Sequence, residues 1–263
     1  MHFYAVSIGS TVPQNNFTAA IQSVFESSLN LRLGHQDRLI TILVSDHYDL
    51  PQGIRLIARN VPFQSLVVGL RAASTEKILR FESSPLLISL REASIWEAQI
   101  PYIDVTLAST RQAWARLWHS LNLQQRLKGT ELIGEDLFQT EQGSHLTRKL
   151  SQPVLGLIAG TKDYDVETAV DAAQKMIGLG PGVTPTGDDI LIGYLAGLWS
   201  ATGDDNQQIK FVEAFGNALL NLIRQTNEIS RTYLYHAIHK QFSSSLIKLL
   251  NAIREGEPDQ IQT

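Results

Sequence analysis

The sequence predicts an α+β protein with a β-rich half at residues 1–105, followed by a helical half at residues 106–263. In the first half, short apolar segments alternate with turns rich in Gly, Pro, Asp and Ser. After about Ile103, apolar residues instead recur every three or four positions, which is the period of an amphipathic helix. The 263 residues, 43% of them hydrophobic and 18% charged, suit one large or two small globular domains.

Six segments of the first half have the length and composition of strands, and their spacing favours an antiparallel barrel or sandwich. They cover residues 2–9, 28–33, 38–45, 53–59, 65–70 and 85–90. Residues 17–27 fit either kind of element, because their apolar side chains also fall on one helical face.

The second half contains several helical stripes. One stripe consists of Trp114, Leu117, Trp118 and Leu121, and Trp96, Trp114 and Trp118 are expected to anchor the core. A second stripe follows Asp165, a good N-cap, and ends near Ile177. Residues 190–199 are apolar on nearly all sides and predict a buried helix. Further helices are expected at residues 208–225, 230–241 and 244–254.

The composition excludes several classes of function. A net charge of −4 argues against nucleic acid as a partner, since phosphate binding requires a basic excess. The absence of Cys rules out disulfides, thiolate nucleophiles and Cys-ligated metals. No apolar run approaches the ~20 residues that span a bilayer, and the start of the chain does not resemble a signal peptide. We therefore expect a cytoplasmic protein without a membrane partner.

The most unusual stretch is GLGPGVTPTGDD, residues 178–189. Its glycines and prolines stop one helix, and Thr184 or Thr186 is expected to cap the next. Asp188 and Asp189 would then lie in the first turn, where the helix dipole stabilises carboxylates by about 0.3–1 kcal/mol. The simplest interpretation is a well-capped junction between two helices.

The number of glycines indicates more than a junction. Gly180, Gly182 and Gly187 allow close approach to backbone N–H groups, and such a loop before a helix is suited to an anion. Carboxylates are better suited to an amide, an ammonium group, an Arg or Mg²⁺. The stretch therefore predicts a site for a small substrate with an anionic end and an amide end. Its candidate substrate-binding residues are Gly180, Gly182, Thr184, Thr186 and Gly187, and its candidate catalytic residues are Asp188 and Asp189.

Polar residues from other segments are expected to complete this site. Asn30 occurs in a predicted strand, where Asn is disfavoured, and Thr226 and Ser230 flank a predicted helix start. The basic residues considered as phosphate partners are Arg32, Arg38, Lys175 and Arg231.

Residues 178–189 resemble the signature of the AllH-like family, formerly a family of unknown function. Residues 28–34 and 226–230 resemble two further family segments, so the similarity extends over most of the chain. One branch of the family is associated with oxamate carbamoyltransferase in anaerobic allantoin breakdown. The resemblance implies carbamoyl transfer between oxalurate and phosphate, giving carbamoyl phosphate and oxamate, by a complex of several different subunits.

Three functions remain open at this point. The chain is a carbamoyltransferase-type enzyme or subunit acting at residues 178–189, a non-catalytic ligand-binding or assembly subunit, or a Mg²⁺-dependent hydrolase that uses the Asp pair. No cofactor is evident, and Mg²⁺ is an open alternative. Two less favoured arrangements are a metal site formed by His236 and His239, and a hydrolase triad formed by Ser230, His236 and Asp188.

Overall fold

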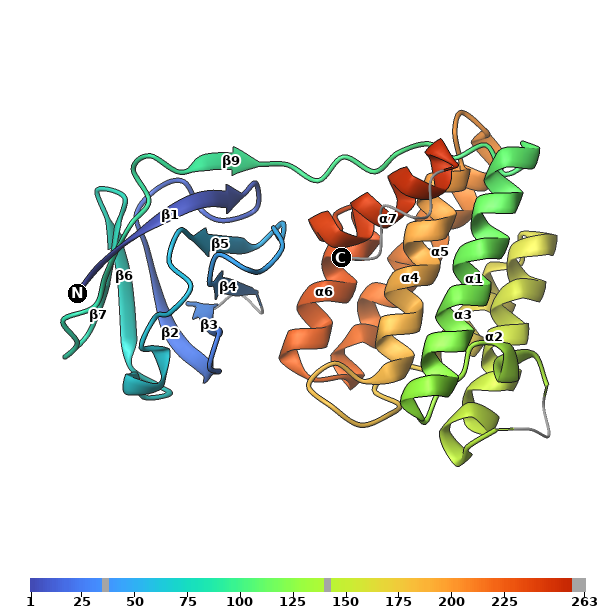
Figure 1. Ribbon diagram of the computed structural model, residues 1–263, viewed down its shortest axis with the longest axis horizontal. Coiled ribbons are helices and arrows are strands. Elements are labelled where there is room, and N and C mark those ends of the chain that lie inside the picture. The colour runs from blue at the N-terminus through green and yellow to red at the C-terminus, as the bar shows by residue number, and fades with distance from the viewer. Residues whose placement is uncertain (35–37, 140–142, 257–263) are drawn as a thin grey trace. The chain divides into compact units, whose positions relative to one another are not determined.

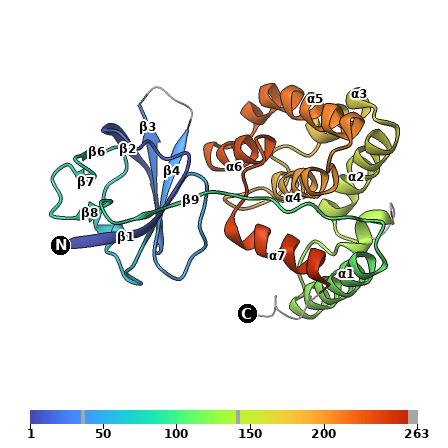
Figure 2. The same ribbon diagram turned by 90° about the horizontal axis from the view of Figure 1, so that it is seen from above.

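The computed structural model describes residues 1–34, 38–139 and 143–256. The chain divides into two compact units (Figures 1 and 2). The barrel unit comprises Met1–Gln99 and Gln241–Leu246, and the helical unit comprises Ile100–Lys240 and the chain from Ile247 onward. The α+β prediction is confirmed.

Within the described residues, the barrel unit is built from eight strands that close on themselves and a ninth that adds to β1. The order is β5-β4-β3-β2-β6-β7-β8-β1, closed by the β1–β5 pairing, and β9 pairs with the end of β1. Three pairings are parallel, namely β1–β8, β1–β9 and β4–β5, so the sheet is mixed. The strands are β1 His2–Gly9, β2 Phe17–Val24, β3 Ser28–Leu33, β4 Leu39–Leu43, β5 Gly53–Leu56, β6 Arg71–Thr75, β7 Ile78–Phe81, β8 Leu87–Ser89 and β9 Ser94–Trp96.

The core of the barrel follows from alternation along the strands. Leu29 and Leu31 of β3 point into the core and are fully buried, and Ile42 and Ile54 continue this layer on β4 and β5. Residues 17–24, which the sequence left ambiguous, form a strand because Ala19 and Ile21 alternate into the same core.

Part of the strand prediction is wrong. Residues 65–70 form no strand; the chain there leaves a short 3₁₀ helix, Phe63–Ser65 (η1), and exposes Val67 and Val68. The hairpin of β6 and β7 was not predicted. Its turn places Glu76 and Lys77 at φ 50° and 60°, a backbone conformation that Asn-Gly pairs normally signal.

The segment Gln241–Leu246 belongs to the barrel unit although it is distant in sequence. Ser244 and Asp49 exchange two hydrogen bonds: the Ser244 N–H donates to the Asp49 carbonyl, and the Asp49 N–H donates to Ser244 Oγ, both at 2.9 Å.

In the part of the helical unit that the structure describes, the predicted helices are present together with one more. The additional helix, α2, is capped by Ser144 and contains Pro153, a residue that normally ends helices. The helices and 3₁₀ helices are α1 Ala108–Lys128, η2 Glu135–Phe138, α2 His145–Asp163, α3 Val166–Gln174, α4 Thr186–Ala201, α5 Asn206–Leu222, η3 Ile223–Gln225, α6 Glu228–Ile238 and α7 Ser244–Glu255. Within the described residues, no helix has the length and apolarity needed to cross a membrane.

The centre of the helical unit lies around α4. Leu191 and Leu195 are fully buried there, and α5 contributes Phe211 and Phe215, whose rings stack at 6.2 Å. The predicted burial of α4 is therefore confirmed on one side, while Gly193 and Gly197 are exposed on another. The tryptophans are less buried than expected: Trp114 is 54% exposed, and Trp96 and Trp118 are half-buried.

Candidate functional site

Residues 178–189 form the turn between α3 and the buried helix α4. Gly178, Gly180 and Gly182 all take positive φ values, of 73°, 115° and 102°, a region that costs other residues energy. The N-cap of α4 is Pro185, without a side-chain hydrogen bond, and Thr186 is the first helical residue. The expected cap by Thr184 or Thr186 is therefore wrong, because Pro185 holds the extended conformation that precedes the helix.

Asp188 is fully buried, and both of its carboxylate oxygens accept hydrogen bonds from this unit. The Gly178 N–H donates to Oδ1 at 2.8 Å, and the Thr226 hydroxyl donates to Oδ2 at 2.5 Å. The Asp188 carboxylate thus holds Gly178, at the start of the loop, and Thr226, which precedes α6, close together. Its contacts are those of a residue that holds the loop in place.

Asp189, the next residue, is exposed. The Thr184 hydroxyl donates to its Oδ2 at 3.2 Å. Partial burial of the carboxyl by neighbouring residues raises the pKa of Asp189 above its ordinary value. The hydrogen bond from Thr184 lowers this pKa, and the nearby charge of Asp188 raises it further. Asp189 is therefore the carboxylate that this turn leaves accessible at the surface.

The glycines of the turn have different roles. A Cβ on Gly187 would lie 2.0 Å from the Met176 carbonyl oxygen, and one on Gly180 would lie 2.7 Å from Thr186 Oγ1. Both glycines are required by close packing within the protein. A Cβ on Gly182 would meet nothing closer than 3.6 Å, so only this one of the three faces open space.

The exposed part of the loop offers unused donors. Among the described residues, the N–H groups of Gly182, Val183 and Thr184 form no hydrogen bond. They immediately precede the N-terminus of α4, where the helix dipole favours negative charge. The loop therefore combines N–H groups without a partner among the described residues with the exposed Asp189 carboxylate.

Asn227, which the sequence reasoning missed, holds the outer side of this loop. Its Nδ2 donates to the Val183 carbonyl at 3.0 Å. Its Oδ1 accepts from the N–H groups of Ile229 and Ser230, so it also caps α6. The signal was an Asn just before a helical stripe, which indicates a cap but not the contact 44 residues away.

Thr226 and Ser230 lie on either side of Asn227. Thr226 contacts Asp188 directly, as described above, and its contact is with protein. Ser230 lies in the first turn of α6, and its Oγ is fully buried without a hydrogen-bond partner among the described residues. Ligand binding by either residue stays a prediction.

Two family models match this chain. One, described as the AllH family N-terminal domain, matches residues 4–95, and the other, described as oxamate carbamoyltransferase subunit AllH, matches residues 176–263. The chain belongs to the AllH family. No curated protein and no solved structure matches it. The second matched segment of this AllH chain contains the loop, Asp188, Asp189 and residues 226–230, and neither model covers residues 96–175.

Asn30 lies in the N-terminal segment of the AllH chain, in the barrel unit. Its Nδ2 donates to Ser23 Oγ at 3.0 Å, and its Oδ1 accepts from the Thr41 hydroxyl at 2.8 Å. These strand neighbours satisfy the buried amide, which explains how Asn is accommodated in β3. Arg32 and Arg38 also belong to the barrel unit, whereas Lys175 and Arg231 belong to the helical unit, as the loop does.

The two less favoured arrangements receive no support from the AllH structure. Ser230 Oγ makes no hydrogen bond to His236, and Asp188 is bound to Gly178 and Thr226, so no Ser-His-Asp triad is formed. His239 Nδ1 lies 2.7 Å from the Tyr235 carbonyl. Within the described ranges, no three His, Asp or Glu side chains are grouped to hold a metal ion, and Mg²⁺ stays an untested prediction.

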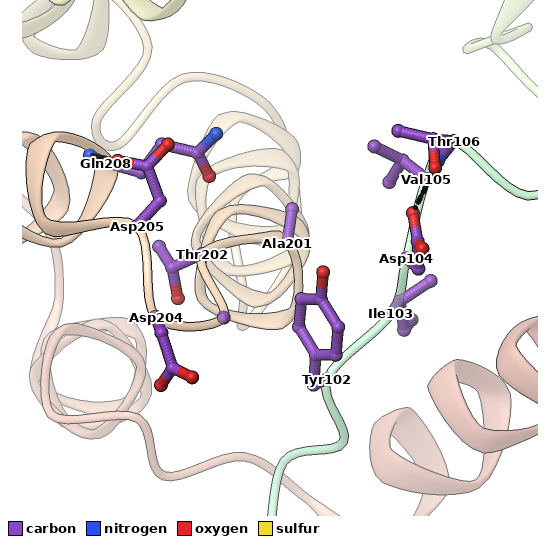
Figure 3. Close-up of a pocket in the computed structure, with 11 residues that line it drawn as sticks. Tyr102, Ile103, Asp104, Val105, Thr106, Ala201, Thr202, Asp204, Asp205 and Gln208 are labelled. Atoms are coloured by element: carbon purple, nitrogen blue, oxygen red, sulfur yellow. Dashed lines mark hydrogen bonds between the residues drawn. The ribbon is translucent and has the colours of Figure 1, made fainter.

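A cavity of about 630 Å³ lies elsewhere in the helical unit, between the segment 102–106 and the α4–α5 junction (Figure 3). Its carboxylates are already engaged or separated: Asp104 accepts from Thr106, and Asp205 caps α5. Figure 3 shows Asp104 across the cavity from Asp204 and Asp205. This separation does not create a cation site.

Proposed function

We propose that this AllH-family chain is a subunit of a carbamoyltransferase and binds a small substrate with a carboxylate and an amide at residues 178–189. The observation that carries the proposal is the different environment of the two aspartates. Asp188 uses both oxygens to fix the loop, while Asp189 and the N–H groups of Gly182, Val183 and Thr184 are presented outward.

These groups match the two ends of an oxamate-type substrate. The loop N–H groups and the N-terminus of α4 would bind its carboxylate. The Asp189 carboxylate would accept a hydrogen bond from its amide N–H. The Thr184 hydroxyl, 3.2 Å from Asp189, holds that carboxylate toward the loop.

The transfer requires a nucleophilic nitrogen and a base. The oxamate amide nitrogen attacks the carbonyl carbon of carbamoyl phosphate, a new C–N bond forms, the C–O bond to phosphate breaks, and phosphate leaves. The nitrogen loses one proton and oxalurate is formed. Asp189 would take that proton, and its raised pKa makes it a better proton acceptor than an ordinary aspartate.

The test is phosphate release from carbamoyl phosphate and oxamate by the chain co-expressed with the other subunits of oxamate carbamoyltransferase. We expect Asp189→Asn to lower turnover at least tenfold. Asp171→Asn, which removes an exposed carboxylate from α3, is the matched control and should keep full activity. Full activity of Asp189→Asn would contradict the assignment.

A non-catalytic role in the same enzyme is the second candidate, because the family model describes a subunit. In that case Asp189→Asn should leave turnover of the assembled enzyme unchanged and weaken only oxamate binding to the isolated chain, measured by calorimetry.

A further inference from the structure

Helix α1, Ala108–Lys128, is a long helix of which few residues are buried by the described part of the chain. Of its 21 residues only Thr110, Ala113 and Asn122 are buried. Figure 2 shows it at an edge of the helical unit. A helix normally gains its stability by burying an apolar face, so this degree of exposure requires an explanation.

Trp114 and Trp118 of α1 and Phe138 of η2 form a connected aromatic cluster, and Leu121 lies on the same side of α1. We call these four residues the α1 face. The rings of Trp114 and Trp118 stack at 6.2 Å, and Phe138 meets Trp118 edge-on at 5.9 Å. Trp114 is 54% exposed, Phe138 49% and Leu121 45%. Clustered, half-exposed aromatic residues are typical of the centres of protein–protein interfaces.

The charge of α1 indicates the kind of partner. The helix carries Arg111, Arg116, Arg126 and Lys128 and has no Asp or Glu, in a chain whose net charge is −4. Arg126 pairs with Glu135 and Asp136 of η2. The described residues offer no ion-pair partner to Arg111 or Lys128, which helical geometry places on the same side of α1 as Trp114. A partner surface with an acidic rim would complement these charges.

Two other occupants fit less well. A second copy of the chain, paired α1 to α1, would bring basic residues against basic residues. A membrane surface favours helices whose charged and apolar sides are separated. In α1, helical geometry places Arg116 beside Leu123 and Leu127 on the side opposite Trp114, so the two kinds of residue are mixed.

We propose that the α1 face binds another subunit of the same enzyme, through an apolar surface on that subunit rimmed by Asp and Glu. This inference rests on the proposed function, since it assumes that the chain works in a multi-subunit carbamoyltransferase. Helix α1 and Phe138 lie in residues 96–175, which neither family model matches.

The experiment uses the full chain, tagged and co-expressed with the other subunits of oxamate carbamoyltransferase. Binding of each purified subunit is then measured by interferometry at low and at physiological salt. We expect Trp114→Ala and Arg111→Glu each to weaken binding of one subunit tenfold or more, and wild-type binding to weaken with salt. Ile158→Ala is the matched control, since Ile158 is 46% exposed on α2 and should change nothing. Melting temperatures are expected to stay at the wild-type value.

Four results would overturn the inference. The first two are that both α1 variants bind the subunit as tightly as the wild-type chain, and that the wild-type chain binds no subunit. The third is that light scattering finds a wild-type dimer that Trp114→Ala converts to monomer. The fourth is that the wild-type chain binds phosphatidylserine vesicles and Trp114→Ala abolishes this binding. Carbamoyl transfer by the same complexes separates this inference from the proposed function. An assembled but inactive wild-type complex would contradict the function alone, and an active complex that tolerates both α1 variants would contradict the docking face alone.

Discussion

Replacing Asp188 with Asn should destabilise the chain by about 1–2 kcal/mol. The wild-type carboxylate accepts from the Gly178 N–H at 2.8 Å and from the Thr226 hydroxyl at 2.5 Å. The amide oxygen can keep one of these donors, while its NH₂ group faces the other, and the Thr226 hydroxyl must then rotate to accept. Both bonds lose their ionic character, and hydrogen bonds to charged groups contribute about 1.5–3 kcal/mol against about 1 for neutral ones.

The assay is thermal unfolding of the full chain, followed by calorimetry. A loss of 1–2 kcal/mol corresponds to a fall in melting temperature of about 2–8 °C for a unit of this size. Thr226→Val removes the same bond from the other side, and the double variant should show a coupling free energy of about 0.5–3 kcal/mol. Additive effects, or an unchanged melting temperature in Asp188→Asn, would refute the reading of Asp188 as the residue that fixes the loop.

Three further predictions concern stability. Asp189→Asn should unfold at or slightly above the wild-type temperature at pH 7, because a pKa raised in the folded state means that the ionised carboxylate opposes folding. This difference in melting temperature, measured against pH, should vanish as the pH falls below the ordinary pKa of Asp. Lys77→Gly should stabilise the barrel unit by about 1 kcal/mol in urea unfolding, since Lys77 has φ 60°. Gly187→Ala should lower the free energy of unfolding by about 1–3 kcal/mol or more, because its Cβ would collide with the Met176 carbonyl. Gly193→Ala, which has open space around it, should raise the free energy of unfolding by about 0.5–1 kcal/mol. Equal effects of the two substitutions in calorimetry would contradict this.

Periodicity predicted most of the fold because burial in both units follows it. The alternation of Leu29 and Leu31 and the apolar stripe of α5 correspond directly to the observed cores. The β6–β7 hairpin was missed because its turn uses Glu76 and Lys77, residues that carry no turn signal. The stripe of α1 was recognised, but a stripe does not reveal whether the same chain supplies the surface that covers it.

The site shows the same limit at the scale of single residues. The glycines and prolines of residues 178–189 located the loop, since their backbone requirements are local. The sequence could not assign the two aspartates, because they are adjacent and chemically identical. What separates them is Thr226, 38 residues further on, whose hydroxyl draws one carboxylate into the interior. Once Asp188 is held there, helical geometry turns Asp189 about 100° away, where it accepts a hydrogen bond from the Thr184 hydroxyl. The contact between residues 188 and 226 therefore decides which carboxylate is buried and which stays accessible at the surface of the loop.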